Sequence, residues 1–290
     1  MQDKQRINTD LKWLIESPDF LSVAEVNLLR KQALLNAGEL LQHAVVDSDD
    51  FRFESTHRLG VYFEQLWHHL IRSQSGLELL RYNQQVIIEK KTLGEFDSII
   101  QQLSTQRTLH CELAVKFYLQ IGHGQRMADW VGPNLRDRFD RKFLRLLNHQ
   151  LALVSKPELQ QWLQEESLVI DRAGLFTKGR LFYSMENYLQ QSFEYPAEVE
   201  VNHLKGFWMT HPDFEEYKSL SNYDWYQLPR MYWLSEITAH DVESLGKVSQ
   251  LSNNQLVKLV AMKEGKEMMR GFVVPDEWLE RARQRVLTDE

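Results

Sequence analysis

The first seventy residues of the chain alternate apolar and polar positions with the period of an α-helix. Segment 57–72, HRLGVYFEQLWHHLIR, predicts an amphipathic helix. Its apolar stripe is Leu59, Phe63, Leu66, Trp67 and Leu70. Segment 10–21 has the same period and is expected to end as a helix at Pro18, and segment 22–42 predicts a second helix. We therefore expect residues 1–55 to form a helical N-terminal extension that contributes packing.

After residue 76 the period changes to two, which predicts strands. The three segments are LELLRYNQQVIIEK (77–90), KTLGEFDSII (91–100) and TLHCELAVKFYLQI (108–121). The odd-numbered positions of the third segment are all apolar, so this face is predicted to be buried. Its even-numbered positions are polar apart from Ala114, and in a half-exposed sheet they would face water.

Pro133 predicts the start of another helix, because the N–H group that proline lacks is unpaired in the first turn anyway. The buried stripe of this helix would be Leu135, Phe139, Phe143 and Leu146. Four basic residues would project together from another face: Arg138, Lys142, Arg145 and His149. They are candidate contacts to nucleic-acid phosphates, and a solvated helix face is the alternative.

The pattern is weaker in the second half of the chain. Segment 167–184, SLVIDRAGLFTKGRLFYS, suggests further strands around turns at Gly174 and Gly179. Nine aromatic residues lie in segment 206–233. They predict a second hydrophobic core, with base stacking as the alternative.

The composition narrows the class of protein. The 290 residues are 43% hydrophobic and 26% charged, as in globular proteins. The formal net charge of -7 argues against a surface coated with phosphate-binding charge. The single cysteine and the polar N-terminus predict a cytoplasmic location without an intrachain disulfide. No apolar run approaches the roughly 18–20 residues of a transmembrane helix, so we expect no membrane partner.

Acidic residues occupy the second and third predicted strands where they would face one another. A hairpin turn centred on residues 104–105 would place Asp97 opposite Glu112. In the same register, Glu95 lies opposite Ala114. Directly opposed like charges repel unless a cation lies between them. Because Mg²⁺ (or Mn²⁺) takes one or two carboxylates together with water and substrate phosphate, Asp97 and Glu112 predict a metal site, with Glu95 as a further candidate ligand.

Lys116 lies on the same polar face as Glu112. In phosphodiester hydrolysis it would orient the attacking water or stabilise the developing charge. The alternative interpretation is structural, because exposed strand faces carry Glu and Lys routinely. Glu95, diagonal to Lys116, would then form an ordinary cross-strand ion pair.

Three pieces in this order resemble the PD-(D/E)xK nuclease superfamily: LGVYFEQL with Glu64, GEFDSII with Asp97, and HCELAVKF with Glu112 and Lys116. The resemblance implies an α/β, restriction-endonuclease-like core over residues 56–190, built from a helix, a three-strand antiparallel meander, a helix and a further strand. It also implies that Asp97 and Glu112 hold Mg²⁺ while Glu64 and Lys116 assist catalysis. The stretches GPNLRDRFDRKFLRLLNHQL and LAVKFYL are similar to a bacterial family known as domain of unknown function 1853. This similarity implies no established activity.

The implied function is metal-dependent hydrolysis of nucleic-acid phosphodiester bonds, with DNA favoured over RNA. One departure is that Ala114 stands where the superfamily has an acid two residues before the lysine. A β-bulge, or Glu95 in place of the missing acid, would restore the site. Without either, the chain is expected to act as a nucleic-acid-binding or regulatory module without catalysis. An interaction module built on the aromatic-rich C-terminal region, residues 191–290, is a third hypothesis.

Overall fold

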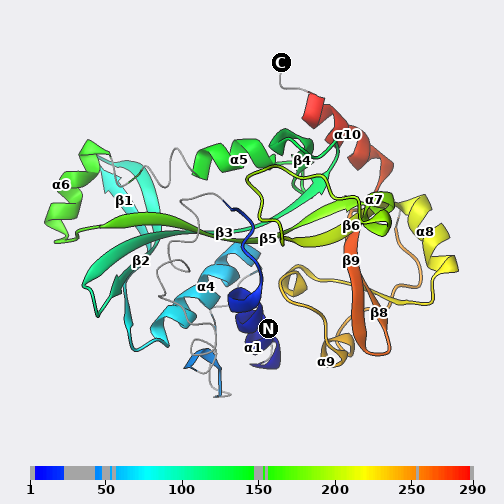
Figure 1. Cartoon of the computed structure of the whole chain (residues 1–290), viewed down its shortest axis with the longest axis horizontal. Helices are drawn as coiled ribbons and strands as arrows, with labels where there is room; N and C mark the ends of the chain where they lie inside the picture. Colours follow the sequence, from blue (N-terminus) through cyan, green and yellow to red (C-terminus); the bar gives the residue numbers. More distant parts are fainter. Residues whose placement is uncertain are drawn as a thin grey trace. The chain divides into compact units, whose positions relative to one another are not determined.

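The computed structural model describes residues 4–22, 43–47, 53, 57–146, 153, 156–252 and 255–287. Within these ranges the chain is a mixed α/β protein (Figure 1). The strands are β1 (Leu77–Ile88), β2 (Lys91–Gln102), β3 (Arg107–Gln120), β4 (Trp130–Val131), β5 (Arg172–Ser184), β6 (Leu204–Thr210), β7 (Asp224–Gln227), β8 (Val257–Lys263) and β9 (Lys266–Val274). The helices are α1 (Lys4–Glu16), α4 (Leu59–Arg72), α5 (Phe139–Arg145), α6 (Pro157–Glu165), α7 (Met185–Gln190), α8 (His211–Leu220), α9 (Ala239–Val242) and α10 (Asp276–Leu287). The nine strands of the described residues form a mixed sheet in the order β1-β2-β3-β5-β6-β9-β8-β7, with β4 paired to β3.

The chain divides into two compact units. The first consists of Met1–Val115 and Lys142–Lys178, and the second of Lys116–Arg141 and Gly179–Glu290. Strands β3 and β5 each contribute residues to both units. The predicted order of helix, three-strand meander, helix and further strand is found along the chain as α4, β1 to β3, α5 with α6, and β5. The assignment of this core to the restriction-endonuclease-like fold stays a prediction.

In the first unit, the predicted helix and meander are confirmed. The apolar stripe of α4 is buried, and α4 packs against β1 and β2. The indole N–H of Trp67 donates a hydrogen bond to Ser98 Oγ of β2 at 3.2 Å. Strands β1 and β2 are joined by Glu89 and Lys90, whose φ angles of 48° and 65° are those of a tight two-residue hairpin turn. Short connections of this kind make the three strands pair antiparallel in sequence order.

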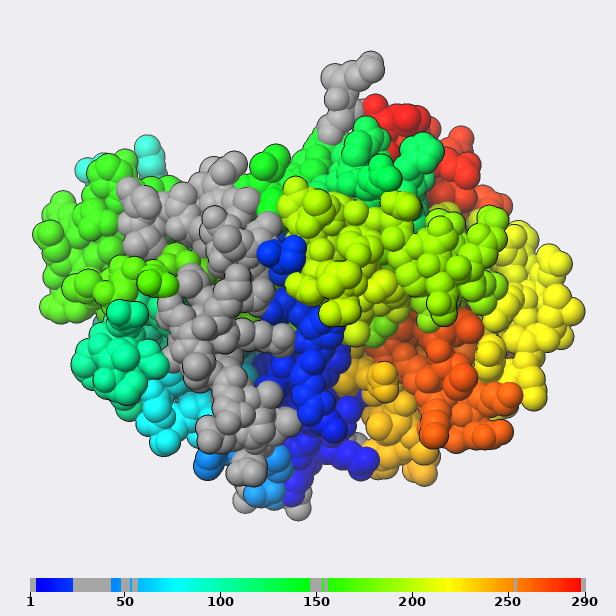
Figure 2. Space-filling model, in the orientation of Figure 1, coloured from blue at the N-terminus to red at the C-terminus, as the bar shows by residue number. Residues whose placement is uncertain are grey.

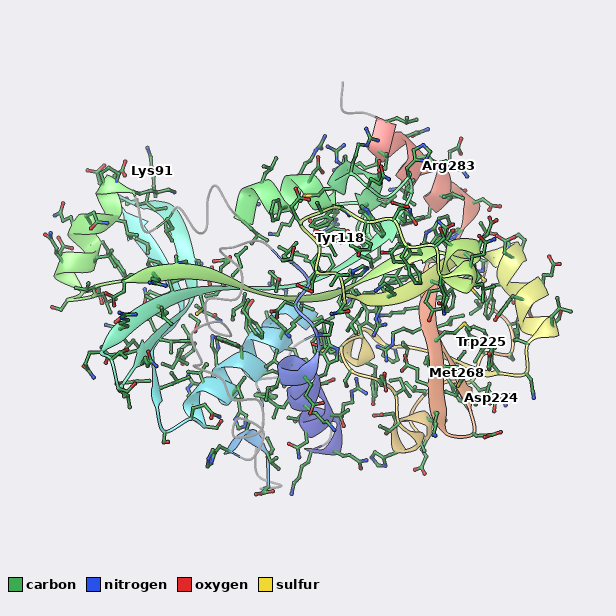
Figure 3. The ribbon with its side chains drawn as sticks, viewed as in Figure 1. Lys91, Tyr118, Asp224, Trp225, Met268 and Arg283 are labelled. Atoms are coloured by element: carbon green, nitrogen blue, oxygen red, sulfur yellow. The ribbon has the colours of Figure 1, made fainter. Side chains whose placement is uncertain are left out.

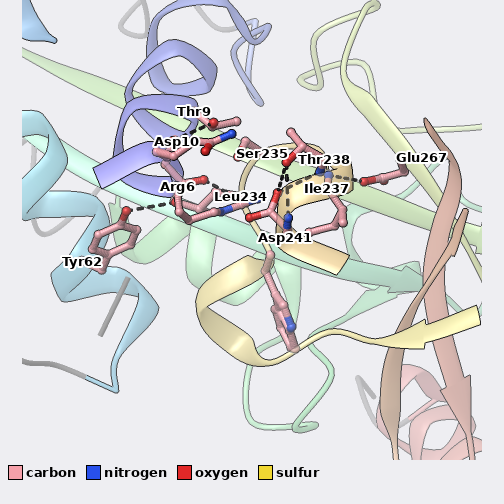
Figure 4. A network of polar contacts seen from close by, with 12 residues as sticks. Arg6, Thr9, Asp10, Tyr62, Leu234, Ser235, Ile237, Thr238, Asp241 and Glu267 are labelled. Atoms are coloured by element: carbon pink, nitrogen blue, oxygen red, sulfur yellow. Dashed lines mark hydrogen bonds and ion pairs between the residues drawn. The ribbon is translucent and has the colours of Figure 1, made fainter. Parts of the chain in front are cut away.

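Helix α1 confirms the first predicted helix and ends at Glu16, two residues before Pro18. A buried polar contact joins it to α4. Asp10 accepts hydrogen bonds from the Arg6 guanidinium at 3.0 Å and from the Tyr62 hydroxyl at 2.9 Å (Figure 4). The helix predicted for segment 22–42 lies outside the described residues from residue 23 onward.

The prediction that a helix starts at Pro133 is wrong, because α5 begins at Phe139. The intervening residues form a turn. The Gly132 N–H donates to the carbonyl oxygen of Asp137 at 2.8 Å, and Leu135 has a left-handed φ of 59°. Because this hydrogen bond closes a turn between Gly132 and Asp137, the helix begins only after the turn.

The turns predicted at Gly174 and Gly179 are also wrong, because both glycines lie inside the single strand β5. A Cβ atom on Gly179 would overlap the backbone oxygen of Lys116 on β3. This glycine therefore permits a close approach of backbones within the second unit, which is a use that a sequence pattern cannot distinguish from a turn.

In the second unit, the predicted aromatic core is confirmed. Trp225 of β7 (Figure 3) meets the rings of Phe207 and Phe214 edge to face, with centroid distances of 5.9 and 5.2 Å. All three side chains are buried in one cluster. Helix α8 packs against β6 and β9, and Figure 2 shows it at the surface in yellow beside the orange β9. These aromatic residues serve packing and are not available to stack on bases.

Lys258 of β8 is a buried amine in the second unit, with 2% of its surface exposed. Four aromatic rings surround its Nζ atom: Trp233 at 4.5 Å, Phe117 at 4.6 Å, Phe182 at 5.1 Å and Phe272 at 5.5 Å. No residue described in the structure hydrogen-bonds to this Nζ. Burial, and then the charges of Arg270 and Arg180, hold the pKa of Lys258 well below its usual value.

We predict that Lys258→Met raises the free energy of unfolding by about 1–3 kcal/mol at pH 7, because methionine fills a similar volume without an unpaired buried amine. Between the lowered folded pKa and the ordinary value of about 10.4, the unfolded chain binds a proton that the folded chain does not. The wild-type protein therefore gains stability as pH rises, and its deficit relative to the variant shrinks between pH 7 and pH 10. Urea unfolding across this range measures the deficit, with the exposed Lys266→Met as control. A deficit that does not change with pH would contradict a neutral Lys258.

Candidate functional site

One row of polar side chains crosses three neighbouring strands of the first unit. In the pairing of β1 with β2, Tyr82 lies opposite Ser98 and Gln84 opposite Phe96, so Asn83 falls beside Asp97. In the pairing of β2 with β3, Ser98 lies opposite Cys111, so the next position places Glu112 on the other side of Asp97. The predicted hairpin register is thus confirmed over the paired residues 98–102 and 107–111, which do not include Glu95 and Ala114. Asn83, Asp97 and Glu112 occupy equivalent positions on β1, β2 and β3.

The backbone ladder between β2 and β3 ends at this row. The last paired residues are Ser98 and Cys111, and the next backbone N–H, that of Leu113, donates to Asp97 Oδ2 at 2.8 Å. On α4, His68 Nε2 donates to the carbonyl oxygen of Asp97 at 3.1 Å. Both the side chain and the backbone of Asp97 are therefore fixed by hydrogen bonds.

The polar face of β3 is buried, which corrects the expectation that it faces water. Glu112 is 4% exposed, and His110, Ala114 and Tyr118 on the same face are also buried. The reason is that β3 is an inner strand, with β2 on one side and β5 on the other, and both of its faces are covered. The structural alternative, a solvated strand face carrying Glu and Lys, does not apply at Glu112.

The carboxylates of this row lie close enough to one another, and to Glu64 of α4, to raise pKa values. Burial, and then the charge of Glu112, raise the pKa of Asp97, while the hydrogen bond from Leu113 opposes the rise. On α4, burial followed by the charges of Asp97, Glu95 and Glu112 raises the pKa of Glu64 from 4.5 to about 7. Glu64 is also hydrogen-bonded to Asn83, which favours its charged form. The structure brings together the four predicted acidic residues Glu64, Glu95, Asp97 and Glu112 closely enough for their charges to interact.

His110 is a site residue that the sequence reasoning missed. Its imidazole is fully buried, with Nε2 at 3.7 Å from Glu112 Oε2 and its ring edge-on to Phe96 at 4.7 Å. Burial lowers the pKa of His110 to about 4, so the ring is neutral near pH 7. Among the described residues, neither ring nitrogen has a hydrogen-bond partner. Its spacing of two residues from Glu112, on the same face of the strand, was the signal that would have indicated it.

Lys116 belongs to the second unit, where its Nζ pairs with Asp137 Oδ2 at 3.3 Å. Its role in orienting water stays a prediction, and the ion pair is a competing use of the same ammonium group.

Arg138 was predicted to project from a helix with other basic residues as a phosphate contact, and this prediction is wrong. This side chain is buried and makes two hydrogen bonds to Asp140, at 2.7 and 2.8 Å, and one to the carbonyl oxygen of Arg285 at 3.2 Å. It is therefore not an exposed phosphate contact. Lys142 is half-buried and Arg145 is exposed, whereas His149 lies outside the described residues.

The carboxyl pair Asp97 and Glu112 offers oxygen ligands for a hard divalent cation. In the part of the chain that the structure describes, no three His, Cys, Asp or Glu side chains are grouped as a metal site. Mg²⁺ is often held by only one or two protein carboxylates, while water and substrate supply the remaining oxygens. The Asp97 and Glu112 pair is compatible with a site of this kind.

Comparison with known proteins identifies the family. Residues 9–287 match the family described as "Domain of unknown function (DUF1853)". The chain belongs to this family. No curated protein and no solved structure gives a significant match, and none of these comparisons links the DUF1853 chain to the PD-(D/E)xK nucleases. Among the described helices, none is long and apolar enough to cross a membrane.

We predict that the stability of this DUF1853 protein depends on pH through Glu64. Between pH 4.5 and about 7 the folded chain holds a proton on Glu64 that the unfolded chain has released, so this group makes the folded state less stable as pH rises through that window. Glu64→Gln should therefore raise the free energy of unfolding relative to wild type at pH 8, and the gain should vanish near pH 5. Chemical denaturation at both pH values measures it, with the exposed Glu158→Gln as control. An equal effect at both pH values would show that Glu64 titrates normally.

Proposed function

We propose that this chain is a metal-dependent phosphodiesterase that hydrolyses nucleic acid, with Asp97 and Glu112 as its metal-binding pair. One observation supports the proposal most: the half-buried Asp97 and the buried Glu112 lie close together on neighbouring strands, and the charge of Glu112 raises the pKa of Asp97. Among the described residues, the charge of His110 would lower the pKa of Asp97, but with its own pKa of about 4 this buried ring is neutral near pH 7 and does not offset the acidic pair. An acidic pair in this setting requires a proton or a metal ion to be stable.

The neighbouring residues support the chemistry of hydrolysis. A divalent cation held by Asp97 and Glu112 would polarise a phosphoryl oxygen and make a bound water more acidic. Glu64 has a pKa of about 7, so near neutral pH it is half ionised and suited to accept a proton from the attacking water. The hydrogen bond from His68 to the Asp97 backbone holds the carboxylate-bearing strand in place. These assignments keep the predicted roles of Asp97, Glu112 and Glu64.

A noncatalytic function is the second candidate, and two observations favour it. Ala114 occupies the position where the nuclease superfamily has an acid, and Lys116 is paired with Asp137. In this alternative the chain keeps the fold and binds nucleic acid, or regulates another protein, without cutting. Cleavage by the wild-type protein separates the two candidates.

We predict that the purified protein cleaves supercoiled plasmid or labelled single-stranded DNA in Mg²⁺ or Mn²⁺, and that EDTA stops the reaction. Asp97→Asn and Glu112→Gln should each lower the rate at least about 100-fold, because each removes a charge that holds the metal ion. Glu158→Gln, which changes an exposed carboxylate of α6, should leave the rate unchanged.

Circular dichroism of each variant checks that the fold is kept. Folded wild-type protein that cuts neither substrate with either metal, or a cleavage rate unaffected by Asp97→Asn, would contradict the proposal.

A further inference from the structure

An exposed tyrosine stands beside the row of carboxylates. Tyr82 of β1 is 52% exposed. The guanidinium of Arg72 lies 4.7 Å from the centroid of its ring, and the ring of His68 lies 5.1 Å away. Single exposed apolar side chains are normal on protein surfaces. Tyr82 differs because a cation and a second ring from α4 fix its position while about half of its surface stays open.

The geometry of α4 explains why Tyr82 and the site lie together. Glu64, His68 and Arg72 are spaced by four residues, so they follow one another along one face of the helix. Glu64 is hydrogen-bonded to Asn83, whereas His68 and Arg72 contact Tyr82. Neighbouring strand residues usually point to opposite faces, but Asn83 has a left-handed φ of 47°, which turns the strand locally. Both side chains can therefore meet the same helix.

The same helix connects Tyr82 to the carboxylates. His68, which contacts the Tyr82 ring, also donates to the carbonyl oxygen of Asp97. Asn83 follows Tyr82 in the chain and occupies the row that contains Asp97 and Glu112. The backbone at Tyr82 is thus one residue step, about 3.3 Å, and one strand spacing, about 4.8 Å, from that of Asp97.

We propose that Tyr82 is a stacking platform for an unpaired base, so that the substrate class of this site is single-stranded nucleic acid. The inference rests on the function proposed above for the adjoining carboxylates. Bases within a duplex are stacked on one another, so only an unpaired base presents a free face to an aromatic ring. Arg72, behind the ring, strengthens the stack and adds a positive charge near the backbone of the bound strand.

Stacking supplies affinity where phosphate contacts are few. With a net charge of -7 and with Arg138 buried against Asp140, the chain is poorly suited to binding either duplex or single-stranded nucleic acid through many phosphate contacts. Stacking on an aromatic ring does not depend on such contacts and is worth roughly 1–3 kcal/mol per base. Tyr82 therefore contributes a share of affinity that the surface charge does not supply.

The test measures binding separately from cleavage. A fluorescein-labelled single-stranded DNA 12-mer and its duplex are titrated with protein in EDTA, and anisotropy reports the affinity. Wild type should bind the single strand more tightly than the duplex. Tyr82→Leu should weaken single-strand binding about 10-fold and leave duplex binding unchanged, because one stacked base is lost. Tyr82→Phe, which keeps the ring, should bind the single strand like wild type.

Ile87→Ala is the matched control, because Ile87 is an exposed apolar residue of the same strand, 55% exposed. It should leave both affinities unchanged. Equal single-strand affinity of Tyr82→Leu and wild type would overturn the inference, even if Asp97→Asn abolishes cleavage. Conversely, Tyr82-dependent single-strand binding by a protein that cuts no DNA would support the platform and refute the phosphodiesterase.

Discussion

The pairing of β2 with β3 is the constraint on which the candidate site depends. Continuing the register in which Ser98 lies opposite Cys111 places Asp97 and Glu112 at the next opposed positions. A shift by one residue would turn both side chains to the other face of the sheet. The hydrogen bond from the Leu113 N–H to Asp97 then ends the ladder at this point and fixes the carboxylate in place.

Electrostatics distinguish this pair from the other buried charges of the described residues. Four buried cations of the described residues are each matched by a carboxylate: Arg6 by Asp10, Lys178 by Asp19, Arg138 by Asp140, and Arg270 by Glu267. For Lys258, burial and the charges of Arg270 and Arg180 lower the pKa, which disfavours its charged form. Asp97 instead has Glu112 as its strongest electrostatic neighbour. Because like charges this close reduce stability, this pair is the basis of the metal site proposed above.

Local patterns in the sequence predicted much of the first unit and the register of its hairpin. The period-two segments, the stripe of α4 and the turn at residues 104–105 are all short-range signals, and each is confirmed. The errors arose where backbone contacts that the hydrophobic pattern does not encode decide the structure, one distant in sequence and one within a local turn. Gly179 looked like a turn but allows β5 to approach Lys116, and Pro133 looked like a helix start but lies in a turn closed by Asp137. His110 was missed because its burial depends on the strands and helices packed around β3, not on its neighbours in sequence.

Titration with Mn²⁺, followed by electron paramagnetic resonance, measures cation binding by the Asp97 and Glu112 pair, since the signal reports free metal ion. We expect wild-type protein at neutral pH to bind one Mn²⁺ ion in the millimolar range or below, binding to weaken toward pH 5 as the carboxylates take up protons, and Asp97→Asn to lose it. If wild-type protein left all Mn²⁺ free at millimolar concentration, or if Asp97→Asn bound the ion equally well, the two carboxylates would not form a metal site.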